Sequence, residues 1–177
     1  MNKKGITIIL FLISFLLYFL QTNIFSKLTI DGIAPNIFII YILFLGLYTN
    51  SKVSIGVGIF IGFLLDTVYG KCIGISSIMF CILAYVASYF DKNFSKDNKI
   101  TIIVMGIGAT FVYELGYYIL NSIVFNFDID FFSFFKIAFI ENLYNTLLLI
   151  IIYPMFKTLG YKLDRKFKQS NLLTRYF

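Results

Sequence analysis

The sequence predicts an all-α integral membrane protein with six transmembrane helices. Of its 177 residues, 59% are hydrophobic and only 14% are charged, which is too apolar for a soluble domain of this length. Apolar runs of helical length alternate with short polar or charged segments along the chain. A third observation, the position of the basic residues, gives the expected orientation. We therefore expect a single transmembrane domain over residues 1–177.

Six apolar runs supply the expected spans. They are Gly5–Phe25, Ile33–Tyr48, Val53–Tyr69, Ile75–Phe90, Ile100–Phe125 and Phe135–Phe156. A membrane helix needs about 20 residues, so the first, fifth and sixth runs cross easily, while the second and third are short. The linker Thr49–Lys52 predicts a tight hairpin between those two, and a five-span protein with a re-entrant hairpin is the alternative. Pro35 lies near a helix start, where a missing N–H costs little, and Pro154 lies near a helix end.

The basic residues indicate which side of the membrane each end faces. With six spans, 12 of the 15 Lys and Arg residues fall on one side, within segments 3–4, 52, 92–99 and 157–175. Only Lys27, Lys71 and Lys136 fall on the other side. Cytoplasmic loops carry the excess of basic residues, so both termini are expected in the cytoplasm. The net charge of +6 is then a topology signal, and no nucleic-acid partner is expected.

Two stripes of small residues predict close helix contacts. Residues four apart share one helix face, and small side chains on such a face let helix backbones approach closely in lipid. The stripes are Ser54, Gly58, Gly62 and Asp66 on the third span, and Gly106 and Thr110, followed by Glu114, on the fifth. We expect each stripe to be an interface, either inside the fold, in a homodimer or with a partner helix.

Carboxylic acids within the spans predict a polar cluster in the outer half of the membrane. An isolated ionised group in lipid costs several kcal/mol, so such acids usually face a protein interior and find partners. The expected cluster is Asp66, Glu114, Glu141 and Asn145. Glu114 and Asn145 lie about 15 Å deep on neighbouring helices. The alternative is that Asp66 and Glu141 reach the interface or cap loops, while Glu114 bonds to neighbouring Tyr or Asn side chains.

Residues 157–177 are expected to form a basic cytoplasmic tail. Leu159, Leu163 and Phe167 share one helical face, with basic residues mostly on the other. Such an amphipathic segment is typical of helices that lie on an anionic inner leaflet. The residues expected to contact membrane lipids are Lys162, Arg165, Lys166 and Lys168. A cytoplasmic protein partner is the alternative for the same surface.

The sequence favours a protein that is not an enzyme. It contains no histidine and two cysteines, so the commonest general base and the usual zinc-ligand sets are not expected. Asp66 is the only aspartate within a predicted span, whereas an aspartyl dyad needs two. We therefore predict no catalytic residues, no metal and no cofactor.

Several segments resemble the rod shape-determining protein MreD family. They are Gly32–Asn36 (GIAPN), Gly58–Asp66 (GIFIGFLLD), Gly70 and Gly74, Tyr144–Thr146 (YNT), Tyr153–Pro154, and Gln21. The resemblance extends over essentially the whole chain. Asn36 departs from the family pattern, which commonly has an aspartate after the proline, so a role tied to that charge is not carried over.

This resemblance implies a component of the bacterial elongation machinery in the cytoplasmic (inner) membrane, crossing it several times. The partners it implies are MreC, which has one membrane helix, and, through that complex, the MreB filament, RodA and its class B penicillin-binding transpeptidase. The residues themselves leave one alternative, the substrate-binding S component of an energy-coupling-factor vitamin transporter. That protein would use the outer acids to line a ligand pocket and would bind a vitamin.

Overall fold

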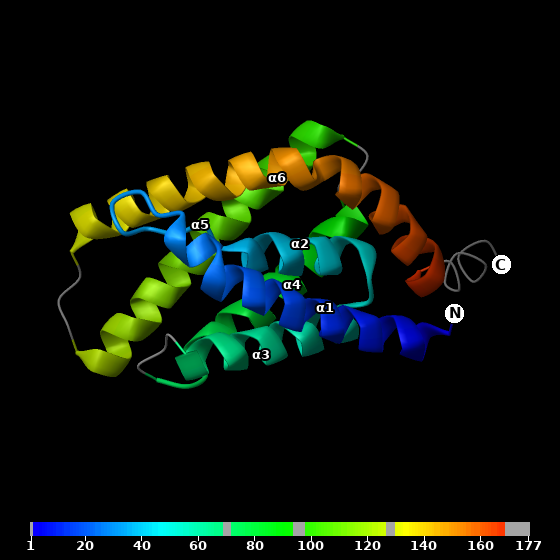
Figure 1. The fold of residues 1–177 in the computed structure, drawn as a ribbon, viewed down its shortest axis with the longest axis horizontal. Coiled ribbons are helices and arrows are strands. Elements are labelled where there is room, and N and C mark those ends of the chain that lie inside the picture. Colours follow the sequence, from blue (N-terminus) through cyan, green and yellow to red (C-terminus); the bar gives the residue numbers. More distant parts are fainter. Residues whose placement is uncertain (1, 69–71, 94–97, 127–129, 169–177) are drawn as a thin grey trace.

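The computed structural model describes residues 2–68, 72–93, 98–126 and 130–168, which form one helical bundle (Figure 1). Its helices are α1 (Lys3–Asn23), α2 (Ile37–Tyr48), α3 (Ser51–Val68), α4 (Ile75–Asn93), α5 (Lys99–Phe125) and α6 (Phe131–Phe167), with a short 3-10 helix, η1 (Phe25–Lys27), after α1. Because these ranges contain helices and no β-strand, the all-α prediction is confirmed. Outside the described residues lie Gly70, Lys71, Lys96, Arg175 and the predicted tail from residue 169 onward.

Four segments are long and apolar enough to cross a membrane. They are Lys3–Lys27, Ser51–Val68, Lys99–Phe125 and Phe131–Phe167. The two remaining apolar helices, Ile37–Tyr48 and Ile75–Asp91, are shorter. Helix α1 begins and helix α6 ends at the same end of the bundle (Figure 1), which is compatible with the predicted even number of crossings.

Helix α2 lies at the centre of the bundle. All 12 of its residues are buried, and it packs against α4, α6, α3 and α5. A helix that is apolar on every side needs to be covered on every side, and here the other helices cover it instead of lipid. With 12 residues, α2 is about 18 Å long, which is shorter than the hydrocarbon core of about 30 Å.

Helix α6 extends further than the sequence predicted. It was expected over Phe135–Phe156, but it continues through Pro154 to Phe167. A proline inside a helix bends it more readily than it ends it when packing holds both halves, and Figure 1 shows that the C-terminal third of α6 turns. This part packs against the end of α2, where a Cβ on Gly160 would lie 2.7 Å from the Tyr48 ring. Residues up to Phe167 therefore belong to the bundle.

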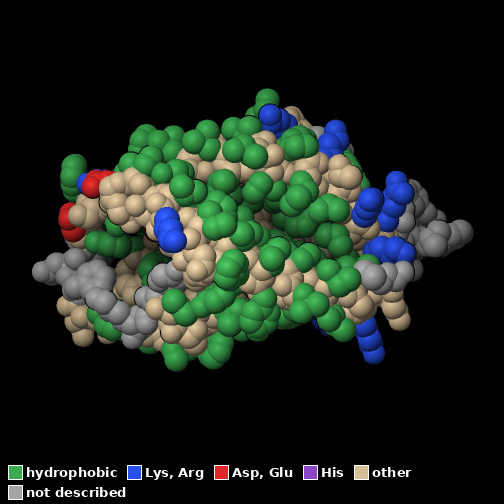
Figure 2. All heavy atoms as spheres, viewed as in Figure 1, with side chains coloured by type: hydrophobic (Ala, Val, Ile, Leu, Met, Phe, Trp, Pro, Cys, Tyr) green, Lys and Arg blue, Asp and Glu red, His purple; other side chains and the backbone are tan. Residues whose placement is uncertain are grey.

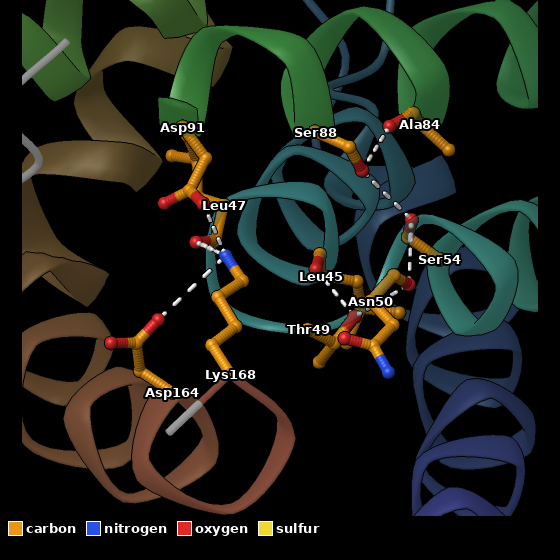
Figure 3. A network of polar contacts seen from close by, with 10 residues as sticks. All are labelled: Leu45, Leu47, Thr49, Asn50, Ser54, Ala84, Ser88, Asp91, Asp164 and Lys168. Atoms are coloured by element: carbon orange, nitrogen blue, oxygen red, sulfur yellow. Dashed lines mark hydrogen bonds and ion pairs between the residues drawn. The ribbon is translucent and has the colours of Figure 1, made fainter. Parts of the chain in front are cut away.

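The end of α6 is tied to α2 and α4 by one lysine (Figure 3). The Lys168 ammonium donates to the Leu47 carbonyl oxygen at 2.7 Å and pairs with the Asp91 carboxylate at 2.5 Å. Asp164, one turn earlier, lies 3.7 Å away. Removing this lysine would break its contacts with both α2 and α4, so these contacts help to hold the C-terminal part of α6 in place.

Candidate functional site

A polar cavity of about 400 Å³ lies among the end of α1, the segment before α2, the end of α3 and the start of α4, with α5 and α6 completing its walls. Helices α1, α3, α4, α5 and α6 and the segment between η1 and α2 all contribute to its walls. The polar side chains that line it are Gln21, Ser26, Thr29, Asn36, Ser76, Tyr113, Glu114, Tyr117 and Glu141. A cavity with this many donors and acceptors can hold water or a polar ligand group.

The segment before α2 is held in place by two side-chain amides. Gln21 of α1 donates to the Pro35 carbonyl oxygen at 2.7 Å and accepts from the Ile37 N–H at 3.1 Å. Asn145 of α6 accepts from the Asn36 N–H at 2.9 Å. These bonds satisfy backbone groups that the Pro35 turn and the start of α2 leave without helical partners. The first and last helices are thereby joined through the start of the central one.

Two glutamates face each other across the cavity wall. Glu114 of α5 and Glu141 of α6 both line the cavity and are 9% and 7% exposed. Asn145 supports the pair by donating to Glu141 Oε1 at 3.5 Å and to Thr110 Oγ1 at 3.2 Å.

We expect Glu114→Gln to be tolerated better than Glu114→Leu. The glutamine amide has the shape of the carboxylic acid and can still donate and accept hydrogen bonds in the polar cavity wall, whereas leucine removes this capacity at a cost of about 1–3 kcal/mol. Thermal unfolding of the purified variants in detergent measures the difference. Equal loss of stability in both variants would show that the charge of Glu114, not its hydrogen bond, is what the fold needs.

Aromatic rings form part of the cavity wall. The rings of Tyr113 and Tyr117 stack with centroids 5.9 Å apart, and Phe80 of α4 stacks on Tyr113 at 4.7 Å. Ser76 of α4 lines the same cavity. Rigid rings with polar ends suit a site that must stay open while its walls pack tightly.

The structure places Asp66 beside the cavity but not on its lining. The Asp66 carboxylate is 2% exposed and accepts from the Gly74 N–H at 2.7 Å and from the Ser76 N–H at 3.2 Å. These N–H groups belong to the start of α4, where helical partners are missing. Asp66 therefore caps α4, whereas Glu114, Glu141 and Asn145 lie together at the cavity.

The stripe on α3 packs inside the fold, against α4. A Cβ on Gly58 would lie 2.9 Å from the Phe80 carbonyl oxygen, and one on Gly62 would lie 2.3 Å from the Ser77 backbone. The hydroxyls of Ser54 and Ser88 are 3.2 Å apart (Figure 3). Of the three predicted kinds of interface, the α3 stripe occupies the one within the chain.

The stripe on α5 packs against α6. A Cβ on Gly106 would lie 2.7 Å from Leu149 Cδ2. Thr110 is fully buried, and its hydroxyl donates to the Gly106 carbonyl oxygen while accepting from Asn145. The small residues of the two stripes thus allow α3 to approach α4 closely and α5 to approach α6 closely.

The four basic residues predicted to contact the inner leaflet differ in exposure and in their partners. Lys162, Arg165 and Lys166 are exposed on the last turns of α6, at the end of the molecule where Figure 2 shows most Lys and Arg side chains gathered. Lys168 is instead held by Asp91 and Leu47. Contact of the first three with lipid stays a prediction.

The predicted site residues did not include seven of the polar side chains that line the cavity, namely Gln21, Ser26, Thr29, Asn36, Ser76, Tyr113 and Tyr117. Gln21 and Asn36 belong to the segments that carry the family resemblance, and that signal pointed to them. Tyr113 and Tyr117 had no such signal, because aromatic residues make up 20% of the chain. Within the described ranges, no three His, Cys, Asp or Glu side chains are grouped so that they could hold a metal ion.

Comparison with known proteins gives one family. The family described as rod shape-determining protein MreD matches residues 2–163. No curated protein matches the chain, and no solved structure does.

Proposed function

Since the chain belongs to the rod shape-determining protein MreD family, we propose that it is a non-enzymatic membrane component of the bacterial cell elongation complex. In this proposal it crosses the cytoplasmic membrane six times with both termini in the cytoplasm. It binds MreC and, through that complex, helps to couple MreB filaments to the peptidoglycan synthases, RodA and its transpeptidase partner.

The observation that carries the proposal is the family match over nearly the whole chain. The arrangement of the resemblance residues supports it, because Gln21, Asn36 and Asn145 meet around the start of α2 and Asp66 caps the neighbouring helix. These residues hold helices together and leave no reactive group aimed at a substrate bond. The role that they favour is a shaped membrane body that binds other proteins.

The distribution of charge supports the proposed orientation. Lys and Arg side chains gather at the end of the bundle that carries both termini, and acidic side chains are seen at the other end (Figure 2). Because basic residues are retained on the cytoplasmic side, the polar cavity would open toward the outside of the cell. The extracytoplasmic part of MreC would then meet the cavity end of the molecule.

We propose that the MreC helix packs in the groove between α4 and α5. Both small-residue stripes are already covered by helices of this chain, so a partner helix needs another surface. The groove is apolar, has a volume of about 510 Å³, and includes Gly108 and Ala109 among its lining residues. A Cβ on Gly108 would meet nothing within 4 Å, so this glycine leaves room for a second backbone.

Gly108→Leu is expected to reduce recovery of MreC while the chain itself stays folded. In the isolated protein the added side chain meets no other atoms at its Cβ, so the fold is not disturbed. In the complex it would occupy the groove and exclude the partner helix. Affinity purification of the tagged variant from bacterial membranes, with MreC measured by mass spectrometry, checks this. Gly56→Leu is the matched control, since a Cβ there would have only Phe11 Cζ at 4.0 Å and lies outside the groove.

The wild-type chain in the same purification tests the proposed function itself. Recovery of MreC together with cell-wall synthases is the expected result, and depletion of the chain should turn rod-shaped cells into spheres. Intact chain recovered without MreC would contradict the proposal. Wild-type levels of MreC with Gly108→Leu would contradict only the placement of the contact.

A further inference from the structure

A second apolar groove, separate from the one proposed for MreC, runs between α1 and α6 with α2 as its floor. It has a volume of about 610 Å³. One wall is the α1 face that includes Ile9 and Ile13, the other is the α6 face that includes Met155 and Leu159, and Tyr41 is part of the floor. On this side of the molecule, hydrophobic side chains cover most of the surface between the two helices (Figure 2).

The groove ends in positive charge. Lys162, Arg165 and Lys166 line it at the C-terminal part of α6, and all three side chains are exposed. Among the described residues, the ion pairs of this part of α6 involve Lys168 and not these three. The groove therefore joins a long apolar channel to a group of basic side chains free to meet an anion.

The length of the groove matches one leaflet of a bilayer. Its α1 wall extends from Ile6 to Leu17, which is about 16 Å along the helix axis. One leaflet contributes about 15 Å to the hydrocarbon core. An apolar channel of this length with cations at one end is complementary to a phospholipid acyl chain and its anionic headgroup, whereas an apolar partner helix would gain nothing from the cations.

We infer that this groove holds one anionic phospholipid. Its acyl chain lies along α2 between α1 and α6, and its phosphate group contacts Lys162, Arg165 and Lys166. The bend in the C-terminal third of α6 brings these basic residues to the end of the groove, where they can contact the phosphate group. The bound lipid would fill the space that separates the first helix from the last.

The test uses the purified full chain, equilibrated with vesicles of phosphatidylcholine that contain phosphatidylglycerol and then transferred to mild detergent. Native mass spectrometry counts the phosphatidylglycerol retained by each protein. The variant K162Q/R165Q/K166Q is expected to retain at least about tenfold less phosphatidylglycerol, since each basic residue near an anionic headgroup contributes about a factor of five. The matched control, K52Q/K99Q/K157Q, removes the same charge outside the groove and should retain wild-type amounts.

A second pair of variants separates the groove from simple surface attraction. Ile13→Trp fills the groove with the basic residues intact, whereas Ile123→Trp adds the same bulk on an exposed part of α5. We expect loss of phosphatidylglycerol only with Ile13→Trp. Retention by that variant, or equal loss in both triple variants, would overturn the site. So would a photo-crosslinker at Met155 that captures a polypeptide instead of lipid in native membranes, because a protein would then occupy the groove.

Discussion

Gly62→Ala should destabilise the protein by about 3 kcal/mol or more, although it adds a single methyl group. The new Cβ would lie 2.3 Å from the Ser77 N and Cα atoms. These are backbone atoms, so no change of side-chain rotamer can relieve the clash. Helices α3 and α4 would have to move apart, and overpacking of this kind costs about 1–3 kcal/mol and occasionally more. Thermal or denaturant unfolding of the purified protein in micelles measures the loss.

Two other glycines of α3 make the test specific. Gly58→Ala should cost less, because its Cβ would lie 2.9 Å from the Phe80 carbonyl oxygen. Gly56→Ala should be neutral or stabilising by up to about 1 kcal/mol, since alanine favours helix and the nearest atom is 4.0 Å away. If all three variants unfolded alike, the close contact between α3 and α4 at Gly62 would not be what limits the stability.

Asp66→Ala is expected to cost about 3 kcal/mol. The change leaves the N–H groups of Gly74 and Ser76 without their acceptor, and each buried group that loses its partner costs about 1–3 kcal/mol. Asp66→Asn keeps one acceptor oxygen and should lose about half as much. The measurement is again unfolding of the purified variants in micelles.

Thr67→Ala provides the control for Asp66. Thr67 is exposed, and its hydroxyl donates only to the Leu64 carbonyl oxygen of the same helix, so its removal should change stability by less than about 0.5 kcal/mol. Should Asp66→Ala unfold at the same temperature as Thr67→Ala, the capping role would be wrong. A normal stability combined with loss of a partner would assign the carboxylate to a binding surface instead.

The sequence predicted the helices well where the apolar pattern alone determines them. Helices α2 and α5 match the expected spans to within a few residues, because charged or turn-forming residues flank them. The end of α6 was not predicted, because Pro154 and the basic residues after it are typical of a helix end. Tertiary contacts stabilise the continued helix, because Gly160 packs on Tyr48 and Phe167 is buried.

The candidate site was partly predictable for a related reason. Spacing of four residues identifies the face on which Gly58 and Gly62 lie, but it carries no information about which helix covers that face. Similar depth in the membrane was enough to place Glu114 near Asn145. The contribution of Gln21 could not be derived from periodicity, because its partners are backbone groups of Pro35 and Ile37.

The tie between Asn36 and Asn145 has a consequence for how the protein is made. The two residues are 109 positions apart, so the ribosome must complete most of the chain before the start of α2 finds this partner. Until then, the short central helix lacks one of the two amides that anchor its start and the helix that covers one of its sides. Its insertion therefore depends on helices synthesised later, and truncation before α6 should leave α2 unstable in the bilayer and open to membrane proteases.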